Sequence, residues 1–107
     1  MKKLKFHPDL VPLVRSGSKT TTWRLFDDKN IQMGDELTLI NSKTIGEFAR
    51  GKVVLVNETI FGNLTPEDWA GQEEFSALEE MYKTYSKFYN CVVNENTILK
   101  ISKFRLK

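Results

Sequence analysis

The chain is poor in the residue types that build disulfides and metal sites. Its 107 residues include one cysteine, Cys91, and one histidine, His7. A single thiol cannot form an internal disulfide, and one cysteine with one histidine falls short of the ligands that a structural zinc site needs. We therefore expect a protein that uses neither a metal nor another cofactor.

Long apolar runs are also missing, and so is a large charge of one sign. No stretch approaches the roughly 20 apolar residues of a membrane helix. The basic start, residues 1–6, lacks the apolar stretch and cleavage site of a secretion signal. These absences predict a cytoplasmic protein without a membrane partner. The net charge of +2 is ordinary for a globular domain and decides nothing about a polyanionic partner.

The length and composition fit one compact folding unit. A chain of 107 residues is long enough for one hydrophobic core and too short for two independently stable ones. Apolar residues make up 40% and charged residues 28% of the sequence, as in an ordinary globular protein. We expect a single domain over residues 1–107 and therefore look for a single site.

The start of the chain changes from strand to helix spacing. Leu4 and Phe6 alternate with polar residues, a period of two that predicts a short strand. Apolar residues then recur at helical spacing between positions 8 and 16, and Gly17 suits the left-handed residue just after a helix end. Pro12 makes this helix short or irregular.

The middle of the chain is rich in strand formers. β-Branched and aromatic residues predict an extended segment over 20–23, and a glycine turn at 33–35 leads into a strand over 36–41. The stretch 47–61 is also strand-like. Gly51 within it is typical of a bulge or bend where a sheet curls.

Two helix starts and a closing strand follow. Thr65 before a proline and two acids opens a helix, and Ser76 with Glu79 forms a capping box for the next one. An aromatic stripe behind that box is expected to pack in the core rather than to stack on bases. It consists of Leu78, Met81, Tyr82, Tyr85, Phe88 and Tyr89. Alternation over 97–106 predicts the last strand.

These elements together predict an α+β fold. Its small, mixed, mostly antiparallel sheet must close into a barrel or be covered by the flanking helices, because an open sheet of this size would expose its edges.

Reactive side chains gather in the segment 17–24. In an extended chain Thr22 and Arg24 share one face with Thr20, so Lys19 can act with Thr22 only if the backbone is irregular near Thr20. A buried lysine can lose its proton through desolvation and accept the proton of a threonine hydroxyl, which makes that hydroxyl a nucleophile. A nearby carboxylic acid would protonate the departing amine.

A structural interpretation of these residues stays open. A basic, threonine-rich strand is often simply solvated, and Trp23 and Trp69 are typical core residues, with base stacking by Trp69 or Phe61 as the alternative. Possible ion-pair partners of Arg24 are Asp27, Asp28 and Asp35. Three basic side chains are candidates for contact with phosphate, with simple exposure to water as the alternative: Lys43, Arg50 and Lys52.

Four residues carry a resemblance to a known family. Gly17, Lys19, Thr22 and Arg24 form the G-x-K-x-x-T-x-R pattern of ASCH domains, which belong to the PUA-like group. The glycine–aspartate turn at 33–35, the helical region after Gln72 and the closing strand with its phenylalanine also resemble that family. The resemblance spans nearly the whole chain and implies a small PUA-like β-barrel with flanking helices.

Among ASCH proteins, the length and layout are most similar to small bacterial amidohydrolases that remove the acetyl group from N(4)-acetylcytidine. This resemblance implies that Lys19 is the proton acceptor and Thr22 the nucleophile. It implies Glu73 as the proton donor, with Glu74 as the alternative. The segments 41–47 and 66–72 depart from the small amidohydrolases, and a substrate pocket would be reshaped there.

The resemblance also bears on the partner. Substrate-binding residues would be Arg24, Thr20 and Trp69, and the partner would be a modified nucleoside or RNA. An RNA-binding module without catalysis is the main alternative, with Lys19 and Arg24 holding a phosphate or a base edge. Nuclease activity, reported for some ASCH proteins, ranks lower because His7 would be the only histidine base.

Overall fold

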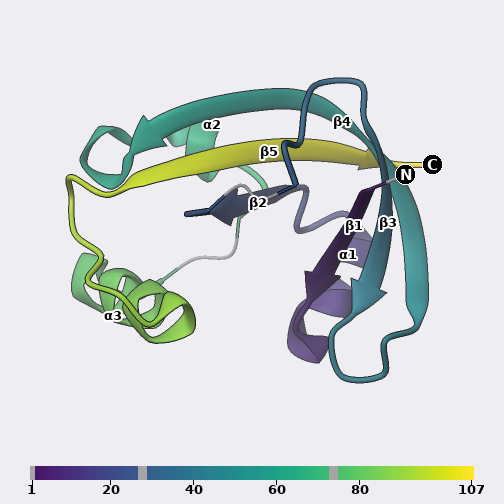
Figure 1. Ribbon diagram of the computed structural model, residues 1–107, viewed down its shortest axis with the longest axis horizontal. Coiled ribbons are helices and arrows are strands. Elements are labelled where there is room, and N and C mark those ends of the chain that lie inside the picture. The colour runs from purple at the N-terminus through teal and green to yellow at the C-terminus, as the bar shows by residue number, and fades with distance from the viewer. Residues whose placement is uncertain (1, 27–28, 73–74) are drawn as a thin grey trace.

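The computed structural model describes residues 2–26, 29–72 and 75–107 (Figure 1). Its strands are β1 (Lys2–Phe6), β2 (Thr21–Arg24), β3 (Glu36–Asn41), β4 (Glu47–Ile60) and β5 (Ile98–Leu106). Its helices are α1 (Val11–Ser16), α2 (Pro66–Trp69) and α3 (Leu78–Tyr89), with 3-10 turns η1 (Pro8–Leu10) and η2 (Phe61–Asn63). Within the described ranges, no helix is long and apolar enough to cross a membrane.

One mixed sheet organises the fold, with the strand order β1-β3-β4-β5-β2. β1 runs parallel to β3, and the other neighbouring strands pair antiparallel. The long strands β4 and β5 curve together over the molecule, and the sheet forms a half-barrel with β1 and β2 at its edges (Figure 1). The prediction of a small, curled, mostly antiparallel α+β fold is confirmed.

Gly51 was predicted to mark a bulge or a bend, and the strand register has no bulge at this residue. Gly51 pairs with Leu37 of β3 and with Leu106 of β5, and the register between β4 and β5 shifts only between Val53 and Leu55. A Cβ atom on Gly51 would lie 3.1 Å from the backbone oxygen of Arg105. Glycine suits this position because the backbone of β5 passes close by, and a side chain would make a tight contact with it.

The helical segment before β2 is short and interrupted, as Pro12 predicts. It consists of η1 followed by α1, and it ends at Gly17, which has a φ of 85°. The N–H of Gly17 donates to the backbone oxygen of Val14 at 3.2 Å. Gly17 therefore turns the chain into the segment that carries Lys19.

The two predicted helix starts have different outcomes. At α2, Thr65 Oγ1 accepts a hydrogen bond from the N–H of Asp68, and Asp68 Oδ2 accepts one from the N–H of Thr65. At α3 no side chain caps the helix, and Ser76 contacts Glu80. The predicted box of Ser76 with Glu79 is wrong.

Two clusters of buried side chains hold the sheet to the helices. The first joins β1, β3 and α1 and includes Leu4, Phe6 and Val14. The second lies between β5 and α3 and includes Trp23, Met81 and Leu99. Figure 1 shows α1 and α3 on opposite sides of the molecule, so the two clusters flank the region that carries β2.

The aromatic stripe of α3 is core only in its middle. Met81 and Tyr85 are buried, whereas Leu78 and Phe88 are 64% and 78% exposed. The expectation that the stripe packs in the core is confirmed for Met81 and Tyr85 and is wrong for Leu78 and Phe88. Phe88 is free to contact a ligand or partner because its ring faces solvent.

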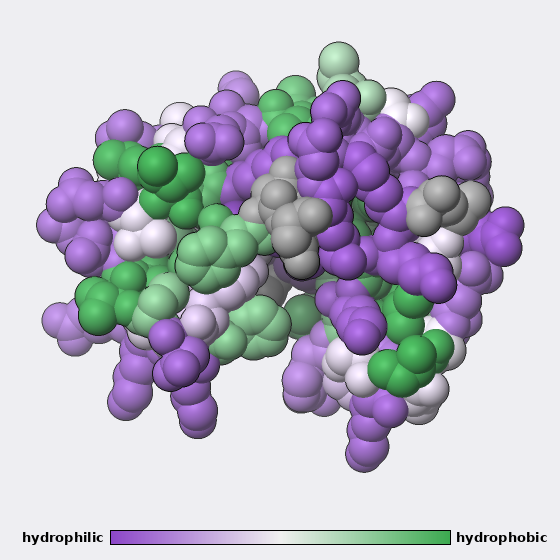
Figure 2. All heavy atoms as spheres, viewed as in Figure 1, coloured by the Kyte–Doolittle hydropathy of each residue, from purple (hydrophilic) through white to green (hydrophobic). Residues whose placement is uncertain are grey.

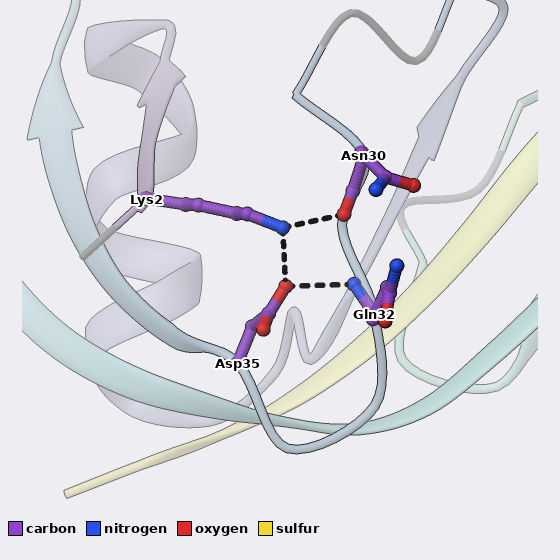
Figure 3. Close-up of polar contacts among 4 residues, drawn as sticks. All are labelled: Lys2, Asn30, Gln32 and Asp35. Atoms are coloured by element: carbon purple, nitrogen blue, oxygen red, sulfur yellow. Dashed lines mark hydrogen bonds and ion pairs between the residues drawn. The ribbon is translucent and has the colours of Figure 1, made fainter.

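A charged contact joins the turn before β3 to β1 (Figure 3). Asp35 Oδ2 accepts hydrogen bonds from Lys2 Nζ at 2.7 Å and from the N–H of Gln32 at 2.8 Å. Lys2 Nζ also donates to the backbone oxygen of Asn30. These bonds, first that from Lys2 and then that from Gln32, hold the pKa of Asp35 below its ordinary value.

Asp35 therefore pairs with Lys2, and the suggested ion pair between Arg24 and Asp35 is wrong. The other two suggested partners of Arg24, Asp27 and Asp28, lie outside the described residues.

Candidate functional site

A cavity of about 390 Å³ lies where the two sides of the molecule meet. One wall comes from β1 and η1, the other from α3, and β2 lies between them. In Figure 2 a notch separates the side that carries α3 from the side that carries α1. The volume falls within the range of roughly 300–1,000 Å³ that is usual for small-molecule sites.

Lys19 and Thr22 reach this cavity from different backbone conformations. β2 begins only at Thr21, and Lys19 lies in the irregular segment before it. The N–H of Thr20 donates to the backbone oxygen of Gly71 at 2.8 Å, which holds that segment in place. Both Lys19 and Thr22 line the cavity. The irregular backbone expected near Thr20 allows both side chains to do so.

Lys19 is a buried amine held by a buried amide. Its exposed fraction is 4%, and Nζ donates to Gln72 Oε1 at 2.8 Å. Gln72 Nε2 in turn donates to the hydroxyl oxygen of Tyr85 at 3.1 Å. Two hydrogen bonds in series thus link Lys19 through Gln72 to α3.

The backbone of Gly71 packs directly on the motif segment. Gly71 has a φ of 82°, and a Cβ atom there would lie 2.0 Å from Thr20 Oγ1. Only glycine combines that backbone angle with so close an approach. Gly71 therefore allows the next residue, Gln72, to reach Lys19.

The remaining predicted binding residues are placed differently. Arg24 lines the cavity with Lys19 and Thr22. Thr20 faces Gly71, and Trp69 packs edge-on against Trp23 with ring centroids 4.7 Å apart. Trp69 also lines a neighbouring depression of about 540 Å³ with Gly71 and Gln72.

The predicted proton donor lies outside the described residues, since neither Glu73 nor Glu74 is among them. The residues on either side of this pair, Gln72 and Phe75, are at the site: Gln72 bonds Lys19, and Phe75 lines the cavity.

Other residues considered from the sequence have ordinary structural roles. Phe61 is buried against Trp23, with ring centroids 6.1 Å apart. Arg50 pairs with Glu47 at the surface, at 3.3 Å. His7 lines the cavity wall, and its Nδ1 accepts a hydrogen bond of 3.2 Å from the N–H of Asp9. Among the residues that the structure describes, no three His, Cys, Asp or Glu side chains gather to hold a metal ion.

Sequence reasoning missed Gln72 as the partner of Lys19 and Tyr85 as the partner of Gln72. Tyr85 was assigned to the core, which is correct for its ring. A tyrosine on the buried face of a helix also needs a hydrogen-bond partner for its hydroxyl group, and that requirement was the available signal.

A group of aromatic rings stands at the mouth of the cavity. Phe88 and Tyr89 line it, and their ring centroids lie 4.9 Å apart. Phe26, which is 61% exposed, packs on Tyr89 with centroids 5.6 Å apart. The sequence predicted Phe88 and Tyr89 as core and gave no role to Phe26.

Comparisons with known proteins show which solved structures have a similar fold. No protein-family model and no curated protein matches the sequence. Among solved structures, an ASCH domain from Lactobacillus crispatus JV V101 superposes with a TM-score of 0.74 at 12% identity, over 98% of this chain and 79% of that one. A protein from Enterococcus faecalis V583 gives 0.73 at 19% identity, over 92% and 67%. An ASCH protein from Zymomonas mobilis gives 0.62 at 13%, over 96% and 65%. The chain therefore has the PUA-like fold of ASCH domains.

Proposed function

We propose that this protein, with its ASCH-domain fold, is an amidohydrolase that releases cytidine and acetate from N(4)-acetylcytidine or a related acylated pyrimidine nucleoside. The supporting observation is that Lys19 and Thr22 line one cavity and that Lys19 is buried and held there by Gln72. A hydroxyl beside an amine that can accept its proton is the arrangement that nucleophilic catalysis needs.

The proposed first step forms an ester on Thr22. Neutral Lys19 Nζ accepts the proton of the Thr22 hydroxyl while Oγ1 attacks the acetyl carbonyl carbon. The tetrahedral intermediate then collapses, the bond between this carbon and N4 breaks, and N4 leaves with a proton as cytidine. We assign the donation of that proton to Glu73, with Glu74 as the alternative.

The second step restores the enzyme. Water attacks the acetyl ester and gives one proton to the glutamate, the ester bond breaks to release acetic acid, which ionises to acetate, and Lys19 returns its proton to Thr22 Oγ1. Both steps pass through an oxyanion, and Arg24 lines the same cavity as a donor for it, with backbone amides as the alternative. Every role in this mechanism is taken by a protein group, so the proposed reaction uses no metal or cofactor.

The test of this proposal compares two threonine variants. Thr22→Ala should abolish cytidine release while circular dichroism and thermal unfolding stay close to wild type. Thr59→Ala is the matched control, because Thr59 lies in β4 and lines a different depression. Undiminished hydrolysis by Thr22→Ala would reject the proposed nucleophile.

RNA binding without catalysis is a second candidate, favoured by the aromatic rings at the mouth of the cavity. Exposed aromatic side chains such as Phe88 stack on unpaired bases. Lys5 and Arg24, which line the same cavity, supply positive charge for phosphates. Tight, salt-dependent binding of single-stranded RNA without turnover would favour this function, and no binding at low salt would reject it.

A further inference from the structure

We propose that Gln72 is a positioning residue for Lys19 and that the hydroxyl of Tyr85 holds the far end of the Gln72 amide in place. The inference rests on the proposed function, in which Lys19 is the proton acceptor. It concerns the position of the Lys19 amine, which neither the proposed nucleophile nor the proposed proton donor determines.

The chemistry of the three groups gives the amide one favoured orientation. A lysine ammonium only donates hydrogen bonds, so a glutamine that contacts it must present its oxygen. Gln72 Oε1 accepts from Lys19 Nζ at 2.8 Å, and Nε2 points the other way and donates to the Tyr85 oxygen at 3.1 Å. A rotated amide would place an N–H against the ammonium, where neither group can accept, whereas the Tyr85 hydroxyl can bond either end of the amide.

Burial makes this orientation persistent. The exposed fractions of Lys19, Gln72 and Tyr85 are 4%, 8% and 9%. Few water molecules compete for polar groups at such depth, and leaving one of these groups without a partner would carry a desolvation penalty. The ammonium form of Lys19 therefore determines which end of the Gln72 amide it meets, and the hydroxyl of Tyr85 holds the other end.

The backbone of Gln72 is held as well as its side chain. Its N–H donates to the backbone oxygen of Trp69 at 3.0 Å, and the preceding Gly71 accepts a hydrogen bond from the N–H of Thr20. Gln72 thus approaches Lys19 from a fixed position. Proton transfer between a base and a nucleophile is sensitive to small displacements, so a fixed amine benefits the reaction.

A neutral partner suits a proton acceptor better than a carboxylate does. An amide oxygen accepts a hydrogen bond from Nζ without adding a negative charge, whereas a carboxylate at this position would favour the ammonium form. The other charged or titratable side chains of the described cavity walls are Lys5, His7, Asp9, Arg24, Tyr85 and Tyr89.

The first experiment removes one hydroxyl group. Tyr85→Phe keeps the ring in the core and should lower kcat for N(4)-acetylcytidine roughly tenfold, with KM within about twofold, because the amine is no longer held in place. Tyr82→Phe is the matched control: Tyr82 lies on the same helix, packs on Phe61 and is not a cavity residue. Equal kcat values for the two variants would overturn the proposal.

The second experiment replaces the amide by a carboxylate of the same size. Gln72→Glu should move the rising limb of the kcat–pH profile to higher pH by about one unit or more. If Gln72 did not contact Lys19, the new carboxylate would lie too far from Nζ to move this limb. An unmoved limb in a folded Gln72→Glu variant would therefore count against the proposal.

A titration separates this inference from the proposed function. If the wild type releases no cytidine, the proposed function fails. The contact between Lys19 and Gln72 is then tested by a titration that does not depend on turnover. The ¹³Cε resonance of Lys19, assigned with Lys19→Arg, should titrate at a higher pH in Gln72→Glu than in the wild type. Equal midpoints would overturn the positioning role whether or not the protein is an enzyme.

Discussion

Lys19 and Gln72 lie 53 residues apart in the sequence, and Lys19 Nζ donates a hydrogen bond of 2.8 Å to Gln72 Oε1. Both side chains are buried, and the contact joins the segment before β2 to the segment after α2. Thr22 of β2 lines the same cavity as Lys19. The contact with Gln72 therefore helps to set the position of the Lys19 amine relative to the Thr22 hydroxyl.

The stability effects of Lys19 and Gln72 should be coupled. Lys19→Met and Gln72→Met each leave one buried polar group without its partner in this contact, which costs about 1–3 kcal/mol. The double variant removes both groups, so its loss of stability should be smaller than the sum of the single losses by about 1 kcal/mol. Urea unfolding of the four proteins measures this coupling, and additive losses would show that the contact is not formed.

Gly71→Ala should destabilise the fold more than Gly34→Ala. Both glycines have positive φ values, 82° and 91°, so alanine strains the backbone at each by about 1–2 kcal/mol. Only at Gly71 does the new Cβ also meet Thr20 Oγ1, at 2.0 Å, whereas nothing lies within 4 Å at Gly34. Urea unfolding should show the difference, and Thr20→Ala should reduce it. Equal losses at the two glycines would contradict the close packing of Gly71 on Thr20.

Asp35 should stabilise the protein in a pH-dependent way. Lys2 lowers its pKa below the ordinary value of 3.8. A carboxyl group with a lowered pKa contributes stability that is complete above 3.8 and is lost as the pH falls through the lower folded-state pKa. Asp35→Asn should therefore be less stable than wild type at neutral pH, and the two should converge in acid.

The pH dependence of the urea midpoints of wild type and Asp35→Asn tests this. Asparagine can still accept the hydrogen bond from Gln32, so the comparison isolates the charge. Lys2→Met should remove the same pH-dependent part, because Lys2 is its principal cause. A difference between wild type and Asp35→Asn that is constant with pH would contradict the assignment.

Phe88 should contribute to the binding of an unpaired base. Its ring is 78% exposed at the mouth of the cavity, and stacking on one base is worth about 1–3 kcal/mol. Phe88→Ala should therefore weaken binding of labelled single-stranded RNA, measured by fluorescence anisotropy at low salt. Leu78→Ala is the control: Leu78 is 64% exposed on the same helix and is not a cavity residue. Equal affinities of the two variants would reject stacking by Phe88.

Features that depend on neighbouring residues were predictable from the sequence. The alternation of Leu4 and Phe6 predicted β1, and Gly17 predicted the end of the first helix. Thr65 predicted the start of α2 because its capping partner lies three residues away. The spacing of Lys19 and Thr22 also predicted that both can reach one site only through an irregular backbone near Thr20, and Lys19 lies in such a segment before β2.

Features that depend on packing between distant segments were not predictable. Gln72 meets Lys19 only because α2 and α3 fold back on β2, and no local spacing encodes that approach. Gly51 is glycine because of the neighbouring strand β5, which a local bulge signal cannot report.

The most direct test of the proposed function is to incubate the purified protein and its Lys19→Ala variant with N(4)-acetylcytidine and to follow cytidine by chromatography. Buried Lys19 shares the cavity with Thr22, so the wild type should form cytidine and the variant should not. No cytidine from the wild type, or equal amounts from both proteins, would contradict the proposed amidohydrolase mechanism.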